Sequence, residues 1–182
     1  MRNRKNQLTI TLPAFLLGGS DAEFRSFIYG LLISSVHMEK LREQIGGLIG
    51  LNGIQYHILT VISEQVDNGL VTVGDVAKIL QAGNTHITME TGKLVKMGLI
   101  KKTANPTDRR SVLLSLTSLG NRRIKSLTLS RQEINNTIFE GYTEKEFESF
   151  RSLIRKMVDT TSKAIAVANK IKAERNIKPY TT

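Results

Sequence analysis

The sequence contains no cysteine, which excludes several classes of protein. A disulfide scaffold, a zinc site built on thiolates and a redox switch with a reactive thiol all need this side chain. Long apolar runs are also missing, and no stretch reaches the roughly 18 apolar residues of a membrane-spanning helix. The basic and apolar start of the chain is similar to a secretory leader. However, Thr9, Thr11 and Pro13 interrupt the apolar run, and no A-x-A cleavage site follows. We therefore expect a cytoplasmic protein with no membrane partner.

The known motifs of catalysis and metal binding are absent as well. No G-x-S-x-G, P-loop, G-x-G-x-x-G or H-E-x-x-H pattern occurs. The three histidines, His37, His57 and His86, show no i, i+4 spacing for a shared metal ion. The sequence therefore predicts no enzyme activity, no metal site and no cofactor.

Acidic residues are scarce relative to basic ones. The chain has 26 Lys and Arg against 16 Asp and Glu, with a formal net charge of +10. Residues 72–125 hold ten basic and three acidic side chains, so a net +7 of this charge lies in one segment. Such a concentration favours a polyanionic partner, either a nucleic acid or an anionic membrane surface.

Apolar residues at helical spacing predict a mainly helical chain with long amphipathic helices at both ends. The first helix is expected over residues 21–45, with Asp21 as its N-cap and Gly46 and Gly47 as its stop. One continuous helix is expected from Thr117 to Ile138. Capping pairs predict the start of three other helices, and a turn ends one of them: Asn52 with Gln55, Thr72 with Asp75, Thr143 with Glu146, and Asp67-Asn68-Gly69.

Residues 72–120 form the most specific pattern in the chain. Two short helices separated by a tight turn are predicted over residues 72–80 and 84–97. Branched aliphatic residues then predict strands at 99–100 and 112–116, joined by the turn sequence at residues 105–108. A helix-turn-helix followed by a basic hairpin is a winged helix. Its second helix can enter the major groove of DNA, and its hairpin can contact the adjacent backbone or minor groove.

The second of these helices is expected to read DNA bases. Its core face should consist of Ile87, Thr91, Leu94 and Val95. Asparagine can pair with adenine, threonine or methionine can contact a thymine methyl, and guanidinium groups suit phosphates and narrow minor grooves. The candidate DNA contacts on the helix, the following strand and the wing loop are Asn84, Thr85, His86, Thr88, Met89, Lys93, Lys101, Lys102, Arg109 and Arg110.

Three further residues complete this prediction. Asp108 should orient a neighbouring basic side chain, because a bare carboxylate would be repelled by DNA. Arg122 and Arg123, on the following helix, are expected to bind phosphates. For any one of these side chains, the alternative is an ordinary solvated surface residue.

The wing also carries a recognisable spacing, with an aspartate, an arginine two residues later and then L-T-x-x-G at Asp108, Arg110, Leu116, Thr117 and Gly120. Together with the preceding segment VAKILQAGNTHITMETGKLVKMGLIKK, it resembles the MarR family of bacterial ligand-responsive transcription regulators over about residues 21–173. The resemblance implies a homodimer that pairs through its N- and C-terminal helices and binds a pseudo-palindromic DNA operator. It also implies release by a small phenolic or aromatic carboxylate.

Two residues depart from the pattern of that family. Glu90 stands in the recognition helix where the family usually has an apolar core residue. Gly92 lies in the middle of the same helix, where glycine costs roughly 1 kcal/mol relative to alanine. These departures affect the expected base contacts rather than the fold.

The effector site implied by the resemblance lies between the dimerisation helices and the DNA-binding lobe. Such a cleft needs an apolar slot and a few polar anchors. Arg42 or His37 can pair with a carboxylate, and Tyr56 can stack on a phenol. Alternatively, Tyr56 belongs to the core and the other two to the surface. The full candidate set is His37, Met38, Leu41, Arg42, Tyr56, His57 and Leu59.

The expected fold class is a mainly α winged helix-turn-helix with a small β-hairpin wing and long N- and C-terminal dimerisation helices. We divide the chain into an arm available to a partner subunit (1–20), helices for dimerisation and ligand (21–66), a DNA-binding lobe (67–120), C-terminal dimerisation helices (121–175) and a tail (176–182). The expected function is a repressor that binds double-stranded operator DNA as a homodimer and is released by a small aromatic or phenolic carboxylate. The alternative is a constitutive or architectural DNA-binding protein without an effector.

Overall fold

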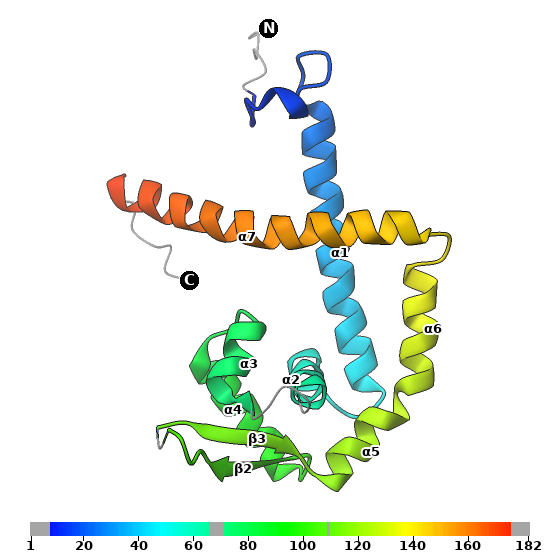
Figure 1. The fold of residues 1–182 in the computed structure, drawn as a ribbon, viewed down its shortest axis with the longest axis vertical. Coiled ribbons are helices and arrows are strands. Elements are labelled where there is room, and N and C mark those ends of the chain that lie inside the picture. Colours follow the sequence, from blue (N-terminus) through cyan, green and yellow to red (C-terminus); the bar gives the residue numbers. More distant parts are fainter. Residues whose placement is uncertain (1–7, 66–70, 109, 176–182) are drawn as a thin grey trace, which may run out of the picture. The chain divides into compact units, whose positions relative to one another are not determined.

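The computed structural model describes residues 8–65, 71–108 and 110–175. These residues belong to two compact units, Met1–Gln132 and Glu133–Thr182. The mainly helical winged-helix fold expected from the sequence is confirmed, with helices flanking a small antiparallel sheet (Figure 1). The predicted turn at residues 67–69 and the tail at 176–182 lie outside the described residues.

The first unit begins with an arm that folds back on helix α1 (Ala22–Gly47). A 3₁₀ turn over Pro13–Phe15 places the Phe15 ring edge-on against Phe24, with 5.9 Å between ring centroids. Thr9 donates two hydrogen bonds of 2.7 Å to Asp21 Oδ2, one from its backbone and one from its hydroxyl. Asp21 was expected to cap α1 and makes no capping bond, because Thr9 and Arg25 take its carboxylate oxygens. The described part of the arm is thus attached to its own chain.

The end of α1 differs from the prediction at Gly46, which lies inside the helix rather than stopping it. A Cβ on Gly46 would lie 2.8 Å from the Leu51 carbonyl oxygen and 3.0 Å from the Tyr56 Cβ. This glycine therefore allows helix α2 (Gly53–Glu64) to pack close against α1.

Helices α2, α3 (Val73–Ile79) and α4 (Asn84–Lys96) enclose the core of the first unit, beside the sheet (Figure 1). The predicted capping boxes of α2 and α3 are both confirmed. Of the expected core residues of α4, Ile87, Thr91 and Leu94 are fully buried. Val95 was assigned to the core wrongly, because it lies at the margin of the buried face and is 37% exposed.

The sheet has the strand order β1-β3-β2, and both pairings are antiparallel. The predicted hairpin is present as β2 (Ile100–Ala104) and β3 (Val112–Leu116), with Ile100 opposite Leu116. The first strand, β1 (Val71–Thr72), was missed, because two residues are too short to show a period. It pairs with the inner edge of the wing and ties the start of α3 to β3.

The helix expected from Thr117 to Ile138 is instead two helices, α5 (Ser118–Ser126) and α6 (Thr128–Ile138). Two hydroxyls at the break compete for backbone carbonyls. Ser126 Oγ donates to the Arg123 carbonyl, and Thr128 Oγ1 donates to the Lys125 carbonyl. Local side-chain bonds of this kind favour an interruption of the helix.

The second unit consists largely of helix α7 (Glu144–Glu174). Its predicted capping box of Thr143 and Glu146 is confirmed, and Gly141 before it has a φ of 83°. No described residue of α7 is buried. Across the described part of the chain, none of the helices combines the length and apolar character required to span a bilayer.

Candidate nucleic-acid interface

The six residues of α4 predicted to contact DNA all lie on its exposed side. They are Asn84, Thr85, His86, Thr88, Met89 and Lys93. The Thr88 hydroxyl donates a 2.8 Å hydrogen bond to the Asn84 carbonyl, so its proton is used within the helix. Met89 is 55% exposed although it is apolar, and such a side chain suits contact with a thymine methyl.

The two lysines predicted to bind DNA from the wing are not equivalent. Lys101 and Lys102 are consecutive residues of β2, and successive side chains of a strand point to opposite faces. Lys101 is exposed and Lys102 is half-buried. The structure therefore does not bring the two lysines together as a pair, and Lys101 is the more exposed to solvent.

The wing loop is shaped by its own polar side chains. Asp108 Oδ1 accepts a 3.0 Å hydrogen bond from the backbone N–H of Arg110, so this carboxylate orders the turn. Asn105 belongs to the predicted turn at residues 105–108, but its individual contacts were not predicted. Its amide donates to Ser111 Oγ at 2.7 Å, and its carbonyl oxygen accepts from both the backbone and the hydroxyl of Thr107. Arg110 is exposed, and Arg109 lies outside the described residues.

The expected phosphate contact by Arg123 has a competing structural role. Arg123 Nη1 donates a 2.6 Å hydrogen bond to the carbonyl of Ile49, in the connection between α1 and α2. This bond joins α5 to residues 74 positions earlier in the chain. The neighbouring Arg122 is exposed, so it is the better candidate for a phosphate.

The L-T-x-x-G part of the wing motif has a clear packing reason. Thr117 Oγ1 donates to the Gly98 carbonyl at 2.6 Å and accepts from the Gly120 N–H at 3.0 Å. A Cβ on Gly120 would lie only 2.1 Å from the Leu99 carbonyl oxygen. The motif therefore fixes the start of α5 against the strand that leads into the wing.

The candidate effector residues fall into two groups. Tyr56 and Leu59 are buried in the core, at 6% and 0% exposure, so neither offers a surface to a ligand in this structure. His37 and Met38 are exposed on α1, and Leu41 is half-buried. His37 borders a small apolar hollow with Leu32, Ile33 and Val36.

Arg42 and His57 are the two candidate effector residues that the structure brings into direct contact. Arg42 Nη1 and His57 Nδ1 are 3.0 Å apart, and the same guanidinium is paired with Glu39. Among the described residues, Arg42 Nε is a buried side-chain nitrogen that has no hydrogen-bond partner. Burial lowers the pKa of His57, and the Arg42 charge lowers it further. The neutral ring therefore accepts a hydrogen bond from Arg42 at Nδ1.

Comparison with known proteins agrees with this geometry. A model of the MarR family matches residues 49–111, from the connection between α1 and α2 to the wing loop. The regulator PapX of Escherichia coli, an HTH-type transcriptional regulator, is 32% identical over 112 residues, which are 62% of this chain and 68% of PapX. PrsX of Escherichia coli, of the same description, is 28% identical over 122 residues, or 66% of this chain and 74% of PrsX.

Solved structures share the fold. MepR of S. aureus in its DNA-binding conformation superposes with a TM-score of 0.68 at 21% identity, over 74% of this chain and 98% of MepR. A mutant of MarR from E. coli, complexed with operator DNA, gives a TM-score of 0.60 at 23% identity, over 76% of this chain and 99% of MarR. This chain therefore shares the winged-helix fold of both solved structures. The chain belongs to the MarR family and is a transcription regulator that binds DNA.

Proposed function

We propose that this regulator is a repressor that binds a DNA operator of two half-sites as a homodimer and is released by a small aromatic carboxylate. The observation that carries the DNA part is the exposed, partly cationic side of α4 beside an ordered wing that presents Arg110. In this proposal the recognition helix reads base edges, and the wing binds the adjacent backbone or minor groove. The proposed contacts are Asn84, Thr85, His86, Thr88, Met89, Lys93, Lys101, Lys102, Arg109 and Arg110.

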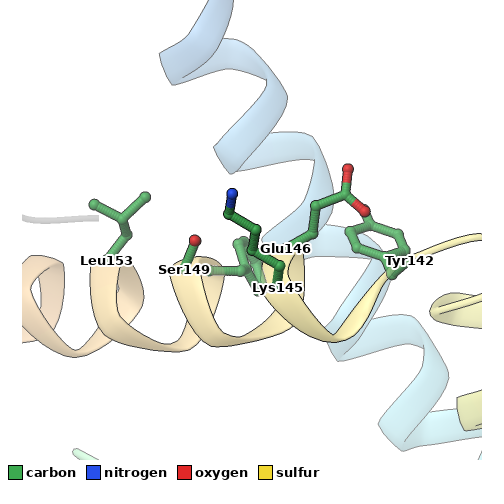
Figure 2. A pocket seen from close by; sticks show the side chains of 6 residues that line it. Tyr142, Lys145, Glu146, Ser149 and Leu153 are labelled. Carbon is green, nitrogen blue, oxygen red and sulfur yellow. The ribbon is translucent and has the colours of Figure 1, made fainter.

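The homodimer is supported by the apolar surface that the single chain leaves exposed. On α7, Phe147, Phe150, Leu153 and Ile165 are each 47–64% exposed. Near the start of α7, Phe150 and Leu153 border an open hollow with a volume of about 370 Å³. Figure 2 shows the side chains that line this hollow on one side of the helix, with Tyr142 just before the helix begins. Helix α1 exposes a further apolar set, Phe27, Tyr29, Leu32, Ile33 and Val36. Apolar surface of this extent is typical of an interface between protein chains.

The effector part of the proposal is supported by Arg42. A buried guanidinium nitrogen without a partner is costly, and a carboxylate oxygen would satisfy it through a charge-assisted hydrogen bond. A ligand on Arg42 would compete with His57 and so act on the packing of α1 against α2. In a dimer that binds DNA with two recognition helices about 34 Å apart, a change in their spacing would lower operator affinity.

The second candidate is a winged-helix protein that binds DNA without any effector. It is favoured by the existing partners of Arg42, because His57 and Glu39 already occupy both of its terminal nitrogens. The two candidates differ in whether any small acid changes DNA affinity.

The first experiment measures binding of the purified protein to DNA fragments from around its own coding region, with and without benzoates, hydroxybenzoates and hydroxycinnamates. Specific binding that one compound releases would support the ligand-responsive repressor. If the variant Arg42→Met binds DNA normally but is no longer released by that compound, the effector site includes Arg42. Specific binding that no compound changes would favour the second candidate. Binding to every fragment with equal affinity would contradict a sequence-specific repressor.

The wing is tested by Arg110→Ala. If Arg110 binds a phosphate, the slope of log affinity against log salt should decrease in magnitude by about 0.9, because one fewer counterion is released. Lys40→Ala removes an equal charge from an exposed position of α1 and should leave the slope unchanged. An Arg110 slope equal to that of the unmodified protein would contradict the wing assignment.

A further inference from the structure

The recognition helix carries a buried carboxylate that its DNA-reading role does not explain. Glu90 is only 4% exposed although it belongs to α4, whose opposite side is open. Each of its oxygens has a partner, because Oε2 accepts from Gln55 Nε2 at 2.8 Å and Oε1 accepts from Lys93 Nζ at 2.7 Å. Burial acts to raise the pKa of Glu90, but these hydrogen bonds outweigh it and the net shift is downward. The group is therefore a buried anion with a hydrogen-bond partner on each oxygen.

The partner on α2 is itself held in place. Gln55 is 8% exposed and closes the capping box of α2 with Asn52. The backbone N–H of Gly53, which follows Asn52, donates a 2.5 Å hydrogen bond to Glu43 Oε2 of α1. A continuous set of polar contacts therefore runs from the end of α1, through the start of α2, to the inner face of α4.

The partner on α4 lies on the side proposed to face DNA. The Lys93 side chain is 58% exposed, whereas that of Glu90 is 5% exposed, so the ammonium group is directed back toward the protein from an open position. Lys93 follows Met89 by four residues and therefore shares its face of the helix. A lysine bound in this way offers DNA less free positive charge than an unpaired one.

We infer that Glu90 is a positioning residue for base discrimination: it fixes α4 to Gln55 of α2 and holds the Lys93 ammonium group, so that Lys93 contacts the operator from a fixed position instead of binding the phosphates of any DNA sequence freely. This inference rests on the proposed function, in that α4 is the helix that reads DNA. Loss of the carboxylate charge should then reduce discrimination between operator and unrelated DNA more than it reduces affinity for DNA as such.

The test is Glu90→Gln, which keeps the size of the side chain and an oxygen that can accept from Gln55, but removes the charge that holds Lys93. We expect affinity for unrelated DNA to rise severalfold and the ratio of operator to unrelated affinity to fall. The salt slope on unrelated DNA should become steeper by up to about 0.9, the value for one added phosphate contact. In the background Lys93→Met, the same Glu90→Gln change should have no effect on that slope.

Gln55→Met provides a second test that leaves all charges in place. It should lower the operator-to-unrelated ratio without changing the salt slope, because Lys93 stays paired with Glu90. Circular dichroism and thermal melting confirm that each variant is folded at the assay temperature. If Glu90→Gln melts lower but leaves both the ratio and the slope unchanged, Glu90 has only a structural role and the inference is wrong.

Failure of the inference can be separated from failure of the proposed interface. Asn84→Ala and Lys101→Met test whether α4 and the wing contact DNA. If both variants weaken operator binding while Glu90→Gln has no effect on discrimination, only the positioning role is contradicted. If neither variant changes binding, the proposed interface itself is contradicted.

Discussion

At some glycines of this protein there is no space for even one added carbon atom, and Gly120 has the least space among the described glycines. We predict that Gly120→Ala destabilises the fold by about 1–3 kcal/mol or more, as overpacking does in a tight core. The added Cβ would otherwise lie 2.1 Å from the Leu99 carbonyl oxygen, so the start of α5 or the strand must move. Urea denaturation measures the change in the free energy of unfolding.

Gly92→Ala is the matched control, because Gly92 is also a helical glycine and a Cβ there would meet no atom of another element within 4 Å. This substitution should stabilise the protein by roughly 0.5–1 kcal/mol through its better helix propensity. Equal effects of the two alanines would contradict the close-contact explanation.

The two adjacent arginines of α5 should separate stability from DNA binding. Arg123→Met is expected to cost about 1.5–3 kcal/mol, because it removes a charged hydrogen bond to the Ile49 carbonyl. Arg122→Met should leave stability within about 0.5 kcal/mol, as is usual for an exposed residue, and should reduce the salt slope of DNA binding instead. Thermal melts and salt titrations of both variants decide the matter. The assignment is wrong if Arg122→Met is the destabilising one.

Structural features that depend on neighbouring residues were predicted well from the sequence. Contacts between distant segments were not. The capping boxes beginning at Asn52, Thr72 and Thr143 each pair residues only three positions apart, so the sequence displays them directly. The burial of Glu90 depends on an amide 35 positions away, and the role of Arg123 depends on a carbonyl 74 positions away. No local pattern encodes such distances.

At the scale of elements, the packing of α1 against α2 should depend on pH. His57 is on the second helix and contacts Arg42 of the first, with Glu39 and Glu64 as the other charged groups that act on it. Because burial and Arg42 lower the pKa of His57 below its ordinary 6.5, the unfolded chain binds a proton more readily than the folded one. The free energy of unfolding therefore loses nothing to protonation of His57 above about pH 6.5, and it should decrease as the pH falls below that value.

Unfolding free energies between pH 7.5 and 5.5 measure this effect, and His57→Gln should flatten the profile over that range. The exposed His37→Gln is the control and should leave it unchanged. A profile with the same slope in His57→Gln would show that another group is responsible. Acidic groups with lowered pKa, such as Glu90, should add their own loss of stability only below about pH 4.5.

The order of elements was predictable because long apolar periods and cap residues mark it, but two boundaries were not. The break between α5 and α6 arises from the hydroxyls of Ser126 and Thr128, which a helical apolar pattern does not register. The short strand β1 exists only because Leu113 and Leu114 of the wing pair with it. In both cases the deciding interaction lies outside the periodicity of the segment.

At the scale of the whole molecule, the exposed apolar residues of α7 support the proposed homodimer of this 20.3 kDa chain. The long terminal helices were predicted from their period, but their partner cannot be predicted from one chain. If a second copy covers them, each protomer contributes the same surface under two-fold symmetry. A charge placed in that surface is then buried twice in one dimer.

We therefore predict that Phe150→Lys converts a homodimer into monomers. Phe150 is 47% exposed in the single chain, and burying an uncompensated ammonium group in an interface is strongly unfavourable. Ser152→Lys is the control, because helical spacing places Ser152 on nearly the opposite side of α7 from Phe150. Sedimentation equilibrium should give twice 20.3 kDa for the unmodified protein and for Ser152→Lys, and 20.3 kDa for Phe150→Lys. Because a monomer offers one recognition helix rather than two, Phe150→Lys should also lose most of its affinity for a two-site operator while keeping its helical circular dichroism. A monomeric unmodified protein, or a dimer unaffected by Phe150→Lys, would contradict the role given to this face of α7.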